Sequence, residues 1–188
     1  TTASNTDGSI TSTVQANTNA GFSIMTYTGN GTAGATIGHG LSAKPDFILT
    51  KRRGSSQTWG TYHTSLGATK YLALNSNAAA GTSTLFWNDT EPTDTLITFG
   101  TEGRVNASGQ TYVAYAWHNV EGFQKFGIYN GSGSTDGTFI YTGFRPKMVW
   151  IKRTNAASVT YGWPVFIDEV NGNVNDAYFK NFWLDQSV

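Results

Sequence analysis

The chain has 188 residues, with 12 Lys and Arg against 12 Asp and Glu, so its formal net charge is zero. Charged residues make up only 13%, whereas Thr, Ser and Asn together fill close to a third of the positions. This balance argues against a nucleic-acid-binding protein. The absence of Cys excludes disulfide scaffolds, thiolate metal sites and cysteine nucleophiles. Aromatic residues reach 14%, which rules out a disordered chain, and the abundance of β-formers and turn-formers favours an all-β fold.

The first segment, residues 1–20, is polar and lacks both the basic start and the apolar core of a signal peptide. No apolar run in the chain is long enough for a membrane-spanning helix, so we expect no membrane insertion. Residues 9–14 alternate well enough to form a strand. We therefore expect residues 1–20 to be an N-terminal strand or linker segment.

The rest of the chain repeats itself once, at an offset of about 101 residues. The first unit, 21–121, carries Gly21-Phe22, Gly40-Leu41, Pro45 and Lys51-Arg52. The second unit, 122–188, carries Gly122-Phe123, Gly143-Phe144, Pro146 and Lys152-Arg153 in the same order. The match continues with Trp59 against Trp163 and Tyr62 against Phe166. This order predicts an internal duplication.

Both units show strand patterns separated by turn residues. Residues 112–117 alternate with both faces apolar, and residues 46–50 and 147–151 are short apolar runs that follow a proline. Asn-Gly and Asp-Gly pairs between such runs suit tight turns. The sequence therefore predicts two tandem β-sandwiches of jelly-roll or concanavalin-like type. Residues 175–182 are a weak helix candidate, and we expect a strand or loop there.

The second unit is incomplete, because the chain ends before any counterpart of residues 85–87, 96–99 and 112–117. An incomplete sandwich leaves a sheet edge with unpaired N–H and C=O groups. We expect a neighbouring chain, or residues 1–20, to supply the missing strands. We therefore expect the chain to form a homo-oligomer, in which copies exchange strands at this open edge.

Several motifs together carry a family resemblance. They are Gly-Phe-Ser-Ile at 21–24, Tyr-Thr-Gly-Asn-Gly at 27–31, Gly-His-Gly-Leu at 38–41, Lys-Arg-Arg at 51–53, Trp59 with Tyr62-His63, and Trp87-Asn88. The chain resembles, over residues 1–188, a domain of unknown function in tail-fibre and other virion proteins of bacteriophages, many of them marine. The resemblance implies a concanavalin-like or jelly-roll sandwich, a location in the virion and outside the cell when mature, and partners among other virion proteins. It implies no catalytic role, and the missing end of the second unit departs from its pattern.

Metal and catalytic sites have little support in the sequence. The three histidines, His39, His63 and His118, are too far apart to suggest a zinc site, so no metal or cofactor is expected. A glycosidase needs two carboxylates about 5–10 Å apart. Asp89 and Glu91 are the tightest acidic pair, which we interpret as a polar turn ahead of Pro92. We interpret the basic runs at 51–53 and 152–153 as strand-end charges, with contact to an anionic glycan as the alternative.

Aromatic and amide side chains in loops offer a better candidate site, because sugars stack on flat rings and hydrogen-bond to amides and carboxylates. The predicted glycan-binding residues are Trp59, Tyr62, His63, Trp87, Asn88, Asp89, Trp163 and Asp168. The alternative is that the repeated Trp59 and Trp163 are core anchors. The sequence thus predicts a non-enzymatic bacteriophage virion module, part of a tail fibre, that projects or binds host-surface glycan. Two alternatives remain: a structural capsid-decorating or filament-forming β-domain, and a polysaccharide depolymerase.

Overall fold

A computed structural model describes residues 1–157, 162–167 and 180–184. The fold is predominantly β, with large antiparallel sheets and almost no helix, as the composition predicts. The strands of the first unit and the N-terminal segment are β1 (Ala3–Asn5), β2 (Ser12–Asn17), β3 (Phe22–Thr28), β4 (Ala35–Gly38), β5 (Phe47–Arg52), β6 (Gly60–His63), β7 (Lys70–Ala73), β8 (Gly81–Thr82), β9 (Leu96–Phe99) and β10 (Thr111–Trp117). The second unit contributes β11 (Met148–Trp150), β12 (Pro164–Ile167) and β13 (Lys180–Trp183).

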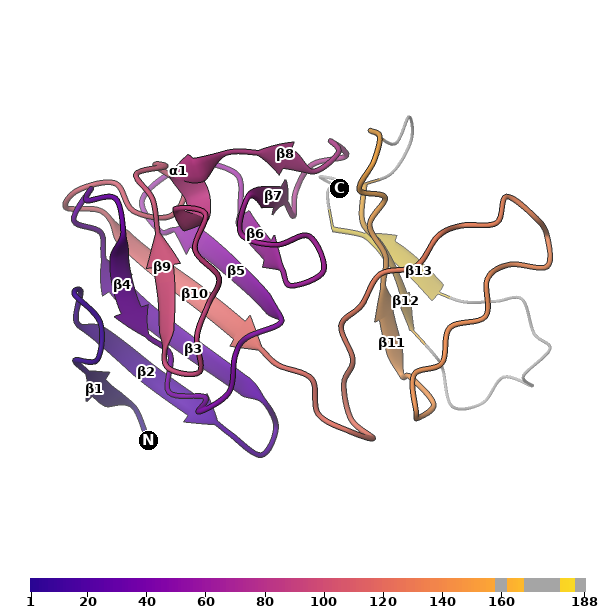
Figure 1. Cartoon of the computed structure of the whole chain (residues 1–188), viewed down its shortest axis with the longest axis horizontal. Coiled ribbons are helices and arrows are strands. Elements are labelled where there is room, and N and C mark those ends of the chain that lie inside the picture. The colour runs from indigo at the N-terminus through magenta and orange to yellow at the C-terminus, as the bar shows by residue number, and fades with distance from the viewer. Residues whose placement is uncertain (158–161, 168–179, 185–188) are drawn as a thin grey trace.

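Eight strands form one large antiparallel sheet in the order β1-β2-β3-β10-β5-β6-β7-β8 (Figure 1). The last strand of the first unit, β10, lies between β3 and β5, and its residues pair with β3 from Thr111↔Thr28 to Trp117↔Phe22. Its alternation explains this central place. Tyr112, Ala114 and Ala116 are fully buried on one face, which we call the inner face of the sheet. The opposite, outer face carries the other half of each strand.

A second layer covers the inner face. Strands β4 and β9 pair with each other from Ala35↔Phe99 to Gly38↔Leu96 and lie in front of the large sheet in Figure 1. Their buried side chains, including Ile37 and Phe99, pack against inner-face residues such as Met25. Burial of these side chains between the two layers makes the main hydrophobic core.

One short helix, α1 (Thr84–Trp87), joins this covering layer and contacts β9. The Ser83 side chain caps it by accepting a hydrogen bond from the Leu85 N–H, and Asn88 ends it in a left-handed conformation with φ 53°. The sequence analysis did not predict this helix, because four residues are too few to show a helical period.

The N-terminal segment belongs to the large sheet of the first unit. β2 pairs with β3 from Ser12↔Tyr27 to Asn17↔Phe22, and β1 pairs with β2 at the sheet edge. Ser12 and Val14 point to the inner face and are buried. Residues 1–20 of this chain therefore do not supply a strand to the second unit.

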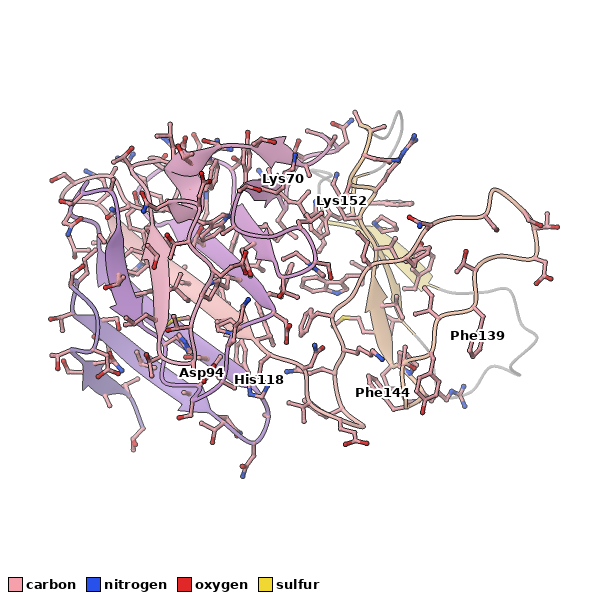
Figure 2. All side chains as sticks on the ribbon, in the orientation of Figure 1. Lys70, Asp94, His118, Phe139, Phe144 and Lys152 are labelled. Carbon is pink, nitrogen blue, oxygen red and sulfur yellow. The ribbon has the colours of Figure 1, made fainter. Side chains whose placement is uncertain are left out.

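The second unit forms a separate three-stranded sheet, β11-β12-β13, at one end of the molecule (Figure 1). Residues 123–129 and 138–141, which match β3 and the region after it in the repeat, form no strand beyond a single bridge at Gln124. Figure 2 shows Phe139 and Phe144 in this loop region, away from the large sheet, and the Phe139 side chain is 86% exposed. Of the weak helix candidate at 175–182, residues 175–179 lie outside the described residues, and β13 begins at Lys180.

The second unit contacts the outer face and far edge of the large sheet. Phe126 stacks on Phe47 with ring centroids 5.5 Å apart, and Trp150 meets the same ring edge-on at 6.3 Å. The Trp163 indole N–H donates to the Ala73 carbonyl at 2.9 Å. These contacts make a second, smaller core on the outer face of β5 to β7. The partly buried rings of Trp59, Tyr115 and Trp117 also pack against this core, each with one part of the ring left exposed. In the described part of the chain, no helix is long and apolar enough to cross a membrane.

Two histidines, the buried His39 and the partly buried His63, make stability sensitive to mild acid. Burial lowers the pKa of His39 below its ordinary value of 6.5, although the hydrogen bond with the Thr93 carbonyl opposes the shift. Burial also lowers the pKa of His63. The His39 Nδ1 accepts the Leu41 N–H, which fixes the neutral form with the proton on Nε2, facing the Thr93 carbonyl. A proton added at Nδ1 would face that N–H.

We therefore expect the free energy of unfolding to fall as the pH drops below about 6.5. The unfolded chain binds a proton near its ordinary pKa, whereas the folded chain does so only at lower pH. The stabilisation is fully present above pH 6.5 and is lost as the pH falls through the folded pKa. Urea denaturation between pH 8 and pH 5 measures this slope. The His39→Gln variant should show a shallower slope, and an unchanged slope would contradict the assignment to His39.

Candidate functional site

The outer face of the large sheet carries a patch of hydroxyl groups, which we call the threonine patch. It consists of Thr11, Thr13, Thr26, Thr28 and Thr111. Strand register brings them together, since Thr13 pairs with Thr26 on neighbouring strands and Thr111 pairs with Thr28. Residues directly opposite one another on antiparallel strands share a face. The patch is therefore a flat set of side-chain hydroxyls on three adjacent strands.

A cation borders this patch. Arg53 follows β5, and its backbone N–H donates to the Thr111 carbonyl at 2.9 Å. Its exposed side chain lines a shallow open groove together with the five threonines. Hydroxyls donate and accept hydrogen bonds, whereas a guanidinium only donates. The groove therefore suits a ligand rich in hydroxyls and carrying some carboxylate or other anionic oxygens.

Next to the patch, four partly exposed rings form what we call the aromatic strip: Phe22, Trp59, Tyr115 and Trp117. The ring centroids of Phe22 and Trp117 are 5.0 Å apart, and Trp59 stacks on Tyr115 with ring centroids 6.3 Å apart. The alternation of β3 and β10 places these rings on the same face as the threonines, because the buried Tyr27 and Tyr112 take the inner face. A sugar chain can stack on flat rings and can form hydrogen bonds with hydroxyl groups, and this face offers both side by side.

Of the residues that the sequence analysis selected, Tyr62 and Trp87 do not fit a binding site. The Tyr62 side chain is 0% exposed and the Trp87 side chain is 1% exposed. They meet edge-on inside the main core at 5.7 Å. Their selection as glycan contacts was wrong, because a fully packed ring offers no face to a sugar.

The remaining first-unit candidates lie on two different layers. Trp59 and His63 belong to the outer face, where His63 meets Phe47 edge-on at 6.0 Å. Asn88 and Asp89 end α1, in the layer that covers the inner face, with φ of 53° and 49°. Only Trp59 joins the aromatic strip. The prediction grouped these residues because they are close in sequence. In the folded chain they lie on different layers, and successive residues of a strand point to opposite faces.

In the second unit, Trp163 is buried and packs in the smaller core, with the Lys152 ammonium 5.6 Å from its ring centroid. This placement fits the alternative that it is a core anchor. Asp168 lies outside the described residues. Neither residue contributes to the threonine patch or the aromatic strip.

The acidic pair also separates. Asp89 is exposed, whereas the Glu91 carboxylate accepts hydrogen bonds from the Tyr62 hydroxyl, the Lys44 ammonium and the Ala68 N–H. Burial alone would raise the pKa of Glu91, but these donors outweigh it and lower the pKa. A carboxylate held by three donors favours the ionised form, so Glu91 is suited to holding the 91–93 loop against Tyr62. Among the described residues, no group of three His, Asp or Glu side chains could hold a metal ion.

The sequence contained a signal for this site that the analysis missed. Thr-Ser-Thr at 11–13 and Thr-Tyr-Thr at 26–28 each have a period of two, which places each pair of threonines on one face of its own strand. The same period puts Tyr115 and Trp117 together on the face opposite Ala114 and Ala116. What the sequence could not give is the order of strands that makes these faces adjacent.

Comparison with known proteins identifies one family. Its model, DUF7483, described as a domain of unknown function, matches residues 1–180. None of the curated proteins and none of the solved structures matches the chain.

Proposed function

The chain belongs to the DUF7483 family, a domain family of unknown function, and we propose, from the resemblance of its motifs to domains of bacteriophage virion proteins, that it is a non-enzymatic module of a bacteriophage virion. In this proposal it forms part of a tail fibre, outside the cell when mature, and binds host-surface glycan through the outer face of its large sheet. Its partners are other virion proteins or copies of itself, together with host polysaccharide. The observation that carries the proposal is the aromatic strip lying beside the threonine patch and Arg53.

The composition supports this assignment of the outer face. A surface built from Thr, Ser and Asn, with few charges, presents many neutral hydrogen-bonding groups and stays adaptable and wet. The Thr hydroxyls can exchange water for sugar hydroxyls at small net cost. Individual contacts of this kind are weak, and several copies on one fibre would raise the overall affinity through effective concentration.

We also propose that 21–121 and 122–188 arose by duplication of a jelly-roll-like sandwich unit. Matched glycines support this, because Gly21 and Gly122 have φ of 60° and 73°, and Gly40 and Gly143 have φ of 69° and 83°. Left-handed backbone at matched positions explains why both copies keep Gly there. The hairpin of β11 and β12 supports it independently, because its register, Met148↔Ile167 and Trp150↔Val165, corresponds to Phe47↔His63 and Leu49↔Thr61 in the hairpin of β5 and β6.

The structural alternative has one specific observation in its favour. Tyr62 and Trp87, two of the aromatic residues in the best-matched motifs, serve the core and not a surface. A capsid-decorating or filament-forming domain with no ligand would need those rings equally. The difference between the two proposals therefore rests on the outer face alone.

Variants on that face separate the two. On an array of immobilised bacterial capsular polysaccharides and lipopolysaccharides, we expect saturable binding that Trp59→Ala and Arg53→Gln each weaken by about tenfold. Trp59 offers a partly exposed ring and Arg53 a free guanidinium beside the hydroxyls. Thr98→Val on β9, in the covering layer, is the matched control and should leave binding unchanged.

Three results would overturn the proposal. Binding retained by both variants would move the site elsewhere. The absence of binding to every polysaccharide, with the wild-type chain folded, would favour the structural alternative. Release of new reducing ends from a bound polysaccharide would show that the chain is a depolymerase.

A further inference from the structure

The small sheet of the second unit copies part of the large sheet strand for strand. In the first unit, β5 and β6 pair with the register Phe47↔His63 and Leu49↔Thr61. In the second unit, β11 and β12 pair with the register Met148↔Ile167 and Trp150↔Val165. Each first strand begins two residues after a proline, Pro45 or Pro146, and each second strand begins directly after a tryptophan, Trp59 or Trp163. β11 therefore occupies the place of β5.

The neighbour of β5 on its other side has no counterpart among the described residues of the second unit. In the large sheet this neighbour is β10, which pairs with β5 over six positions from Tyr112↔Arg52 to Trp117↔Phe47. In the described part of the second unit, β11 is an edge strand with no strand on that side. An edge of this kind presents a row of backbone groups that can pair with a further strand.

Side-chain exposure marks the same gap. Phe47, Ile48 and Leu49 of β5 are at most 4% exposed. Their counterparts on β11, Met148, Val149 and Trp150, are 53%, 39% and 37% exposed. Three consecutive apolar residues with this exposure on an edge strand are unusual, because proteins normally protect edges with charges, bulges or cover.

Among the described residues of the second unit, a counterpart of β3 is also missing, and the lack of a β10 counterpart explains why. In the first unit β3 pairs with β2 and β10 and does not pair with β5. Without a counterpart of β10, residues 123–129 have no neighbour in the small sheet to pair with. Their exposed apolar side chains include Phe123, Ile128 and Tyr129. A single added strand would provide an edge for β11 and for 123–129 together.

We propose that the β11 edge accepts an antiparallel strand of the β10 type, one that lies outside residues 1–188 and that a separate peptide can supply. β10 itself shows the chemistry required: an uncharged strand with small residues, Ala114 and Ala116, on one face and the large rings of Tyr115 and Trp117 on the other. β10 of another copy is not available, since both of its edges are already paired. Main-chain hydrogen bonds supply the affinity, and the alternation of small and large side chains supplies the selectivity.

The test uses the whole chain and a synthetic peptide with the sequence of residues 110–119, Gln-Thr-Tyr-Val-Ala-Tyr-Ala-Trp-His-Asn. Titration into isotope-labelled protein is expected to give saturable binding below about 1 mM. Amide signals of 148–150 should shift, and the amides of both 148–150 and 123–129 should gain protection from hydrogen exchange. In the large sheet the backbone N–H of Tyr115 faces β5, because the Thr111 carbonyl on the same side of the strand accepts the Arg53 N–H and alternate residues share a side. A matched peptide that is N-methylated at the Tyr115 position therefore loses a ladder hydrogen bond to β11 and should bind about tenfold more weakly.

Two chain variants locate the effect. Val149→Lys places a charge on β11 and should weaken peptide binding by at least about tenfold. Thr82→Lys makes the same kind of change on β8, the far edge of the large sheet, and should not alter it. Equal binding of the two peptides, shifts centred on β1 or β8, or no binding up to about 1 mM would each overturn the proposal.

Discussion

Trp87→Ala is expected to lower the free energy of unfolding by about 3–5 kcal/mol. The Trp87 ring is 1% exposed and lies within 6.1 Å of the rings of both Phe86 and Phe99, in addition to Tyr62. Removing it leaves a cavity between α1 and β9 that packed neighbours cannot fill. Domains of this size are stable by only about 5–15 kcal/mol, so the variant would lose a large part of its stability. Urea denaturation followed by fluorescence and circular dichroism measures the change.

Two controls make this result specific. Leu85→Ala lies in the same short helix with its side chain 50% exposed, and should change stability by less than about 1 kcal/mol. Trp87→Phe should cost less than Trp87→Ala, because it keeps most of the ring and removes an indole N–H that is buried without a partner in the described structure. A Trp87→Ala variant as stable as wild type would show that α1 does not close the core.

Asn106→Ala is expected to cost about 3 kcal/mol, through hydrogen bonds and not through apolar contact. The fully buried Asn106 side chain joins three loops. Its Oδ1 accepts the Asn30 N–H at 2.9 Å, and its Nδ2 donates to the carbonyls of Thr32 and Gly100 at 2.9 and 3.0 Å. Alanine would leave these groups unsatisfied, and each such group costs about 1–3 kcal/mol when buried.

Asn75→Ala is the matched control for this substitution. The Asn75 side chain is exposed and accepts one hydrogen bond, from the Trp59 N–H at 3.1 Å, which water can replace. Its loss should cost less than about 1 kcal/mol. Asn106→Asp tests the amide specifically, since a carboxylate can accept but not donate when ionised. If Asn106→Asp were as stable as wild type, the two donated hydrogen bonds would not matter.

Individual strands were predictable because their residues obey local rules. The apolar runs at 46–50 and 147–151 became β5 and β11, and the alternation at 112–117 became β10. Each run carries its own period of two, and turn residues mark its ends. The short helix at Thr84–Trp87 was not predictable in the same way, because only its Ser83 cap distinguishes it from a turn.

The face that we propose for binding was predicted less well, for a reason that concerns strand geometry. Trp59 and Tyr62 are three residues apart in an extended segment, so they point to opposite faces of the sheet. Grouping them as one site required a loop, whereas β6 runs from Gly60 to His63. Which of the two faces is covered depends on β4 and β9, and no local pattern reveals that pairing.

Two residues recur ahead of the two neighbours of β3. Asn5 and Gly8 precede β2, and Asn106 and Gly109 precede β10, at an offset of 101 residues. The two strands flank β3 on its two sides. Two identities do not make a repeat, so the sequence alone did not indicate that these strands would be neighbours of the same strand.

The central place of β10 also determines when the large sheet can close. In the sheet, β10 lies between β3 and β5, so these two strands do not pair with each other. They are joined only after β10 has been synthesised. The hairpin of β2 and β3 and the meander of β5 to β8 can form early. Each then has an unpaired edge, on β3 and on β5, where β10 will later pair. Trp117 must emerge before its pairings with Phe22 and Phe47, 95 and 70 residues earlier, can join the halves. Such non-local closure is slow, and it leaves two apolar edges exposed in the nascent chain until the last strand of the unit inserts.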